Sequence, residues 1–180
     1  ATFKASLFMT AGIIDHETGT RDMRRLAGLM KLMPWTATLA MIAAASMAGI
    51  PLANGLLSKE MFFAEGVGIE RGAVWGVLVP LVATFGGICS VAYSLRFIHD
   101  VFFNGEPKDL PNPHPHEPPL MMKAPVALLV VICLVVGVAP ALTFGPLVQV
   151  AATAVLGHAP PEYDLALWHG VNLPLAMSAV

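Results

Sequence analysis

The feature that most constrains this chain is an apolar run at residues 73–95, which contains no charged side chain. Its length of about 23 residues exceeds the roughly 20 that a helix needs to cross the hydrocarbon core of a bilayer. Only 12% of the 180 residues are charged, whereas soluble domains average about 25%. The sequence therefore predicts an all-α polytopic membrane protein.

Further apolar segments predict additional membrane helices on both sides of this run. Residues 36–49 and 124–139 each read as a membrane helix, and residues 147–156 as either a short helix or the return leg of a kinked one. Ala1 and Val180 both lie inside apolar segments, so the first and last helices are expected to be truncated. We predict about five to six transmembrane helices in a single membrane-embedded, internal fragment of a longer protein.

Polar segments are expected at the membrane surface. Residues 21–31 place apolar side chains on one side and basic side chains around the rest, a pattern typical of an interfacial amphipathic helix. The polar turn at residues 15–20, which includes Glu17, is expected to be solvated. Residues 104–119 alternate prolines with polar residues and therefore predict an extended surface loop.

The stretch at residues 49–63 breaks one of these membrane helices. Pro51 lacks a backbone donor and collides with the preceding turn, so the arriving helix must stop or break near Ile50. Asn54 and Gly55 follow before the apolar run resumes. In a bilayer, such a break is tolerated only where protein or a water-filled cavity re-satisfies the freed carbonyls. Ion sites of transporters are often built at breaks of this kind.

Lys59, within the resumed helix, is the strongest candidate for a functional residue. A lysine at mid-membrane costs about 2.5–3.5 kcal/mol to insert and usually faces a bundle interior. Burial there disfavours its charged form, as a proton carrier requires. Lys4 is the second candidate, because its neighbours Phe3, Leu7 and Phe8 are apolar. For each lysine, the alternative is a side chain that only extends to the lipid headgroups.

The accessory candidates for a proton relay are three polar residues near the two lysines: Ser6, Ser58 and Glu60. Adjacent residues on a helix do not face each other. A direct ion pair between Glu60 and Lys59 is therefore less expected than a partner on another helix.

No pattern typical of a metal, cofactor or nucleic-acid site is found in the sequence. Cys89 and Cys133 stand alone in apolar runs and are interpreted as small core residues. His114 and His116 have the spacing of a metal pair, but they alternate with prolines in a loop without further ligands, so solvated histidines are favoured. Glycine-rich phosphate loops and basic clusters are absent, and the net charge is −2.

Three motifs resemble the antiporter-like membrane subunits, which include the L subunit of respiratory complex I and the A subunit of the Mrp-type cation/proton antiporters. They are residues 1–8 (ATFKASLF), 22–29 (DMRRLAGL) and 48–60 (AGIPLANGLLSKE). Three later segments resemble the A subunits of bacterial Mrp antiporters: residues 93–105 (YSLRFIHDVFFNG), 114–119 (HPHEPP) and 167–175 (LWHGVNLPL). The resemblance covers essentially the whole chain.

This resemblance implies a proton pathway along a central polar axis of lysines, histidines and glutamates. Lys4 would match the lysine in the middle of that axis, and Lys59 the lysine on the second broken helix. Residues 1–103 would form the second half of an antiporter-like helical repeat, and residues 120–180 further transmembrane helices. Many relatives have two prolines at the break, whereas Leu52 follows the proline here, so the local backbone is expected to differ.

The function implied is that of a proton-translocating segment in the A subunit of a monovalent cation (Na+ or K+)/H+ antiporter. It would act in the bacterial inner membrane with the other membrane subunits, of the B to G type, as part of a transporter without a cofactor. One alternative is a proton-pumping protein similar to the L subunit of complex I. A second alternative is a membrane scaffold that transports nothing.

Overall fold

The computed structural model describes residues 2–67, 73–159 and Met177, and every regular element in that part of the chain is a helix. The prediction of an all-α fold is therefore confirmed. In chain order the elements are α1 (Thr2–Thr18), α2 (Leu29–Leu32), α3 (Pro34–Ala48), α4 (Asn54–Val67), α5 (Ala73–Ile98), the π-helical turn η1 (His99–Phe103), α6 (Leu120–Val138), α7 (Pro140–Thr143) and α8 (Gly145–Leu156).

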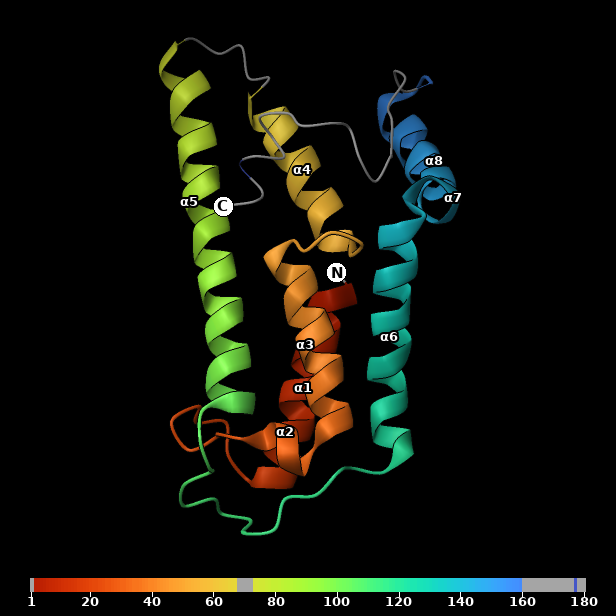
Figure 1. Ribbon diagram of the computed structural model, residues 1–180. Coiled ribbons are helices and arrows are strands. Elements are labelled where there is room, and N and C mark those ends of the chain that lie inside the picture. Colours follow the sequence, from red (N-terminus) through yellow and green to blue (C-terminus); the bar gives the residue numbers. More distant parts are fainter. Residues whose placement is uncertain (1, 68–72, 160–176, 178–180) are drawn as a thin grey trace.

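The centre of the helical bundle is a column formed by α1, α3 and α4 (Figure 1). α4 continues from α3 across a turn at residues 49–53, and α1 packs beside α3 with its first residues near the level of that turn. α5 and α6 flank the column, and both contact α3 and α4. α7 and α8 follow α6 at the end of the bundle opposite the loop at residues 104–119.

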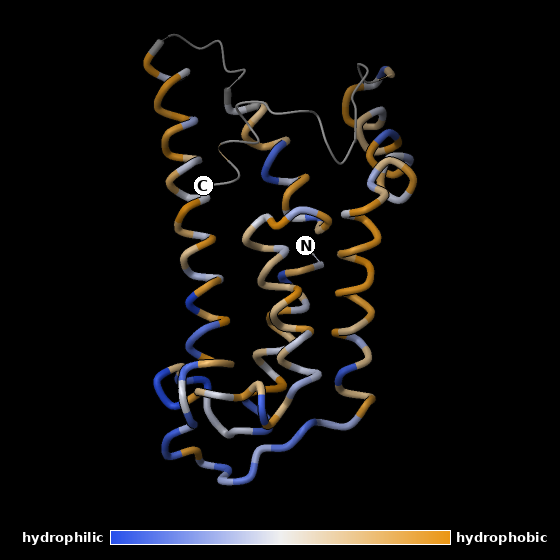
Figure 2. The backbone as a smooth tube through the Cα atoms, viewed as in Figure 1, coloured by the Kyte–Doolittle hydropathy of each residue, from blue (hydrophilic) through white to orange (hydrophobic). Residues whose placement is uncertain are grey.

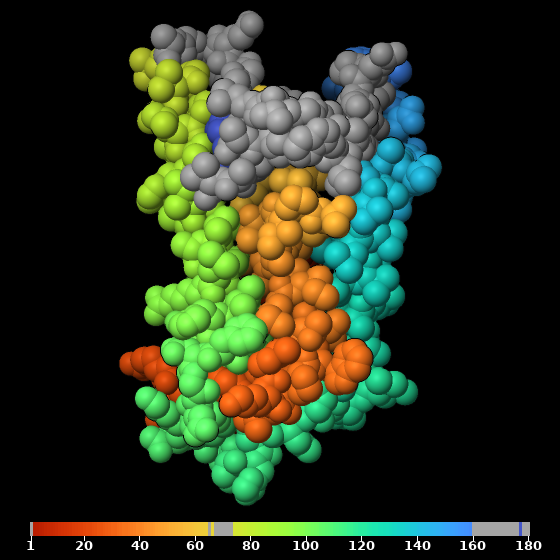
Figure 3. All heavy atoms as spheres, in the orientation of Figure 1, coloured from red at the N-terminus to blue at the C-terminus, as the bar shows by residue number. Residues whose placement is uncertain are grey.

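Two segments of the described chain are long and apolar enough to cross a membrane, Val74–Phe103 and Leu120–Val138. Hydrophilic residues gather at the end of the bundle that carries the loop at residues 104–119 (Figure 2). α5 forms one outer side of the molecule (Figure 3), where large apolar side chains such as Leu81 and Phe85 are exposed. The predicted number of spans stays a prediction, and the predicted last helix near Trp168 lies outside the described residues.

The predicted break at Pro51 is present between α3 and α4. α3 ends in a Schellman motif, in which the N–H groups of Gly49 and Ile50 donate to the carbonyls of Ser46 and Ala45, each at 3.1 Å. Gly49 has a φ of 91°, a conformation that glycine adopts readily because it lacks a Cβ. Pro51 cannot extend the helix because it has no N–H to donate.

The turn after Pro51 contains a second left-handed residue, Leu52, with a φ of 75°. A residue with a Cβ pays roughly 1–2 kcal/mol for this conformation. Proline could not take this place in the same backbone, because its ring holds φ near −65°. The turn observed here is therefore one that two consecutive prolines could not adopt.

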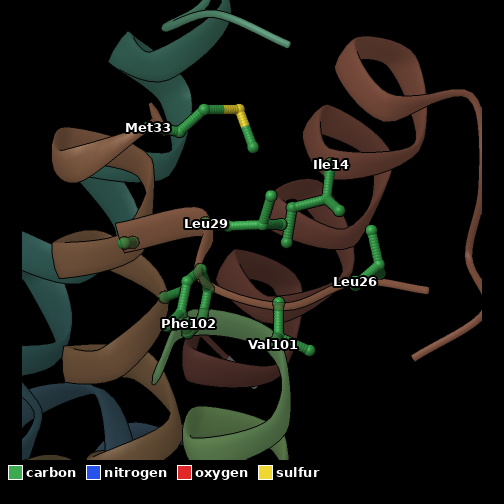
Figure 4. Close-up of a cluster of buried hydrophobic side chains, with 8 residues drawn as sticks. Ile14, Leu26, Leu29, Met33, Val101 and Phe102 are labelled. Carbon is green, nitrogen blue, oxygen red and sulfur yellow. The ribbon is translucent and has the colours of Figure 1, made fainter. Parts of the chain in front are cut away.

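A cluster of buried apolar side chains closes the end of the bundle near the loops (Figure 4). Ile14 of α1, Leu26, Leu29, and Val101 and Phe102 of η1 are each less than 5% exposed. These contacts place residues of the segment 21–31 in a protein core rather than on a membrane surface.

The predicted interfacial helix at residues 21–31 is wrong, because only Leu29–Leu32 is helical there. The Asp22 carboxylate accepts hydrogen bonds from the guanidinium and the backbone N–H of Arg24, which favours a turn. These bonds lower the pKa of Asp22 to about 2. Gly28 has a φ of 61°, and a Cβ at this position would overlap the carbonyl oxygen of Gly105 in the facing loop.

The loop at residues 104–119 lacks regular structure, as predicted, and polar contacts hold it to the bundle. The Glu117 carboxylate accepts hydrogen bonds from the N–H groups of Trp35 and Thr36 at 3.1 Å, and it thereby caps α3. Lys123 pairs with the same carboxylate at 3.3 Å. No local pattern could predict this cap, since Glu117 lies 82 residues after Trp35.

Replacing Leu52 by glycine is expected to stabilise the complete protein in detergent by up to about 1 kcal/mol, because glycine avoids the Cβ penalty at positive φ. Leu52 is 54% exposed, so little packing is lost. Ile50→Gly is the matched control, because Ile50 is 53% exposed and does not have a positive φ. In thermal unfolding scans, a lower midpoint for Leu52→Gly than for Ile50→Gly would contradict the left-handed backbone at Leu52.

Candidate functional site

The site is built around the carbonyl groups that remain where α3 ends. The last four carbonyls of an α-helix lack partners inside the helix, and within a membrane each must find another donor. The Schellman motif satisfies the first two of these, the carbonyls of Ala45 and Ser46. The Met47 carbonyl accepts a hydrogen bond from the Ser90 hydroxyl at 3.3 Å, and the Ala48 carbonyl accepts one from Lys59 Nζ at 2.7 Å. Side chains of α5 and α4 thus complete the end of α3.

Lys59 is half-buried and lies against the end of α3. A Cβ added at Gly49 would be only 3.0 Å from Lys59 Cδ, so the glycine leaves room for the lysine stem. The break therefore provides both the carbonyl that accepts the ammonium group and the space that the side chain occupies.

Lys59 and Lys4 line one open pocket of about 550 Å³ between α1, α3, α4 and α5. We call it the lysine cavity. Ser58, Ser90 and Tyr93, which carry hydroxyl groups, also line it. The structure therefore brings together the two lysines that the sequence singled out, although they come from different helices. The space is open to the surroundings and mostly apolar, and the two lysines with the hydroxyl-bearing side chains are its polar groups.

Lys4 is exposed on α1 and also lines a second, smaller pocket of about 200 Å³. The wall of this second pocket is mostly apolar and includes Leu7 and Phe97. Met47 and Tyr93 line both spaces, and the Tyr93 hydroxyl donates to the Met47 sulfur at 3.2 Å. The lining of the lysine cavity is also mostly apolar, so Lys4 borders two largely apolar spaces.

Four polar side chains meet at the start of α4, and we call them the Asn54 junction: Thr2, Ser46, Asn54 and Cys133. Asn54 Nδ2 donates to Thr2 Oγ1 at 2.9 Å. Asn54 Oδ1 accepts from Ser46 Oγ at 3.0 Å and from Cys133 Sγ at 2.8 Å. The junction therefore joins α1, α3 and α6 to the first residue of α4.

Two glycines let the backbones approach closely beside this junction. A Cβ at Gly55 would overlap the Ser46 carbonyl oxygen, and one at Gly137 of α6 would overlap the Leu52 carbonyl oxygen. Small residues permit such approaches between membrane helices. Gly55, which the sequence marked as part of the break, is thus required for the packing of α4 against α3.

The three accessory candidates lie in different surroundings. Ser58 lines the lysine cavity. Ser6 is fully buried, and its hydroxyl donates to the Thr2 carbonyl of its own helix at 3.0 Å. Glu60 is 5% exposed and does not belong to the cavity wall. Of the three, only Ser58 shares the cavity with the lysines.

Sequence reasoning did not single out Ser90 and Tyr93 of α5. With Gly86 they recur at spacings of four and three residues, which places them on one helical face. This stripe of small and polar residues within an uncharged run could have indicated the site from the sequence. Cys89, beside the stripe, is exposed and lines the cavity, so its interpretation as a core residue is wrong, whereas Cys133 is buried as predicted.

Glu17 was expected to be solvated, but only 3% of it is exposed, because the loop at residues 104–119 covers it. Its carboxylate oxygens lie 3.1 Å from His16 Nδ1 and 2.6 Å from His116 Nδ1, and Asn112 donates to its backbone carbonyl. His116 is therefore paired with a buried carboxylate. Within the described residues, no group of three or more His, Cys, Asp or Glu side chains could hold a metal ion.

Comparison with known proteins shows which family this chain resembles. Residues 1–86 match the family described as NADH:quinone oxidoreductase/Mrp antiporter, transmembrane. The whole chain is 59% identical over 180 residues to a protein of Rhizobium meliloti (strain 1021) named as the probable A/B subunit of a K+/H+ antiporter, and it covers 18% of that protein. Residues 1–86 are therefore similar to the transmembrane region of this family.

Two further matches agree with the antiporter branch of the family. The chain is 40% identical over 190 residues to the A subunit of the Na+/H+ antiporter of Bacillus subtilis (strain 168), with 99% of this chain and 24% of that protein covered. A solved structure of the Mrp complex from Dietzia sp. DQ12-45-1b contains a chain that is 38% identical, with a TM-score of 0.81, 99% of this chain and 18% of that chain covered. The resemblance inferred from the motifs is confirmed, and the chain spans about a fifth of the length of these relatives.

Gly49→Ala is expected to destabilise the complete protein by about 1–2 kcal/mol, since its backbone is left-handed and a Cβ would press on the Lys59 stem. Gly86→Ala is the control, because a Cβ there meets nothing within 4 Å, and alanine favours a helix over glycine by about 0.5–1 kcal/mol. Thermal unfolding in detergent compares the two. Equal or greater stability of Gly49→Ala would argue against the packing of Lys59 on the end of α3.

Proposed function

We propose that this chain is a proton-translocating segment in the A subunit of a monovalent cation/H+ antiporter, with Lys4 and Lys59 as proton carriers. The observation that carries the proposal is the single cavity that both lysines line beside a broken helix. The relatives described above are named for K+ and for Na+, so the proposed cargo is a monovalent cation. The alternative of a complex I subunit has less support, because these relatives are antiporter subunits.

In the proposed mechanism, the charge of Lys59 determines how firmly α4 is held to α3. The protonated ammonium group makes a charge-assisted hydrogen bond to the Ala48 carbonyl, and such bonds are roughly twice as strong as those between neutral groups. Transfer of the proton from Lys59 to water in the lysine cavity therefore weakens this contact. The hydroxyls of Ser58, Ser90 and Tyr93 provide hydrogen-bonding partners for water on the way to Lys4.

Two ammonium groups that line one cavity repel each other, which favours states in which only one of the lysines is charged. A proton that arrives at one lysine would therefore promote the release of a proton from the other. Alternation between these charge states would couple electrostatically to cation movement elsewhere in the antiporter.

We further propose that the chain acts in a bacterial inner membrane together with the other membrane subunits of the antiporter, of the B to G type. The solved relative is part of a complex, which supports an assembly of several subunits. The exposed apolar side chains of α5, including Leu81 and Phe85, offer a surface suited to lipid or to a neighbouring membrane helix.

Lys59→Ala in the assembled antiporter is expected to lower cation/proton exchange by about 100-fold or more, the scale at which a positioned proton-transfer group contributes. Lys4→Ala is expected to act in the same direction. Exchange is measured as the dissipation of ΔpH when Na+ or K+ is added to inverted membrane vesicles, and native gels verify assembly.

Lys31→Ala is the matched control, because Lys31 is an exposed lysine on α2, outside the lysine cavity. It should leave the exchange rate unchanged. Normal exchange in the Lys4→Ala, Lys59→Ala double variant would overturn the relay and favour a scaffold in which both lysines extend to the headgroups.

A further inference from the structure

The side chain of Asn54 links the two helices that carry the lysines. Asn54 is the first residue of α4, five positions before Lys59, and it donates to Thr2 on α1, two positions before Lys4. The same carboxamide accepts hydrogen bonds from Ser46 of α3 and Cys133 of α6. One side chain therefore connects the start of the broken helix to each of these three helices.

The contacts around Asn54 leave little freedom to this part of the structure. Both lone-pair directions of Oδ1 are used, and Ser46 and Cys133 are fully buried. Close packing at Gly55 keeps α4 against α3, and close packing at Gly137 keeps α6 against the turn at residues 49–53 beside the carboxamide. A shift of the first turn of α4 must therefore change the hydrogen bonds of Asn54.

We propose that Asn54 is a positioning residue that couples the position of Lys59 on α4 to the helix that carries Lys4. This inference rests on the proposed function. When the bond from Lys59 to the Ala48 carbonyl weakens, α4 loses one of its restraints at the end of α3, and the Asn54–Thr2 hydrogen bond transmits a shift of its first turn to α1. Coupling of this kind needs an element with two arrangements that both sites influence, and the inference assigns this role to the turn at residues 49–53.

The first test removes the link to α1 and leaves the lysines intact. Thr2→Val keeps the shape of the side chain but removes the hydroxyl that Asn54 binds, whereas Thr2→Ser retains a hydroxyl. In inverted vesicles that hold the complete antiporter, Thr2→Val is expected to lower exchange by about tenfold and to shift its pH profile. Thr2→Ser is expected to retain the normal exchange rate and the normal pH profile. Asn54→Ala should resemble Thr2→Val, and the Thr2 pair remains informative if Asn54→Ala fails to assemble.

The second test uses the thiols of the segment as reporters. Cys133 is 1% exposed and bound to Asn54, whereas Cys89 is exposed and lines the lysine cavity, so its labelling serves only to show that the reagent reaches the segment. N-ethylmaleimide labelling of the complete complex is followed for both cysteines by peptide mass spectrometry. Lys59→Ala is expected to raise the labelling rate of Cys133 by about fivefold or more over that in the Lys31→Ala control, because loosening α4 opens the Asn54 junction. A purely structural role of Asn54 would leave Cys133 insensitive to Lys59.

The outcomes separate this inference from the proposed function. If Lys59→Ala abolishes exchange but Thr2→Val retains the normal rate and pH profile, with Cys133 labelling unchanged in Lys59→Ala, the coupling by Asn54 is overturned and the relay stands. If Lys59→Ala exchanges normally, the relay itself is overturned. Loss of exchange in both variants, rescue by Thr2→Ser and faster labelling of Cys133 would establish the coupling.

Discussion

The structure of this segment depends on how the last carbonyls of α3 are satisfied. Pro51 forces the helix to end inside an apolar environment, where unpaired carbonyls are costly. The backbone itself satisfies two of them through the Schellman motif at Gly49. The other two bind Ser90 and Lys59, so the end of α3 holds α5 and α4 in place. Lys59 and the Ala48 carbonyl would each be unfavourable in a membrane without a partner. The hydrogen bond between them satisfies both groups.

The same end of α3 organises the candidate site. Because Lys59 reaches back to the Ala48 carbonyl, its ammonium group lies beside the cavity that Lys4 also lines. The Asn54 junction fixes the first turn of α4 against three other helices, and glycines at positions 55 and 137 allow the close backbone approach that this requires. The proposed proton relay and the packing of the bundle therefore share the same few residues.

The opposite end of the bundle is held by interactions of a different kind. An apolar cluster that includes Leu29 and Phe102 joins η1 to α1 and α3. Beside it, the loop at residues 104–119 contributes Glu117 as the cap of α3 and covers the Glu17 carboxylate with His116. α3 is therefore fixed at its start by a carboxylate and at its end by an ammonium group, each supplied by another element.

The sequence by itself determined the helical membrane architecture, the break at Pro51, and the choice of Lys4 and Lys59 as candidates, because apolar runs, proline and buried charge act locally along the chain. Family motifs extended this to the antiporter subunits. Only the tertiary structure decided that both lysines share one cavity, that Asn54 binds Thr2, and that Glu17 is buried, since these depend on partners far away in the chain. The prediction of a helix at residues 21–31 was wrong for the same reason. Its amphipathic pattern fits a membrane surface as well as a protein core, and contacts with η1 and the facing loop place its apolar residues in the core.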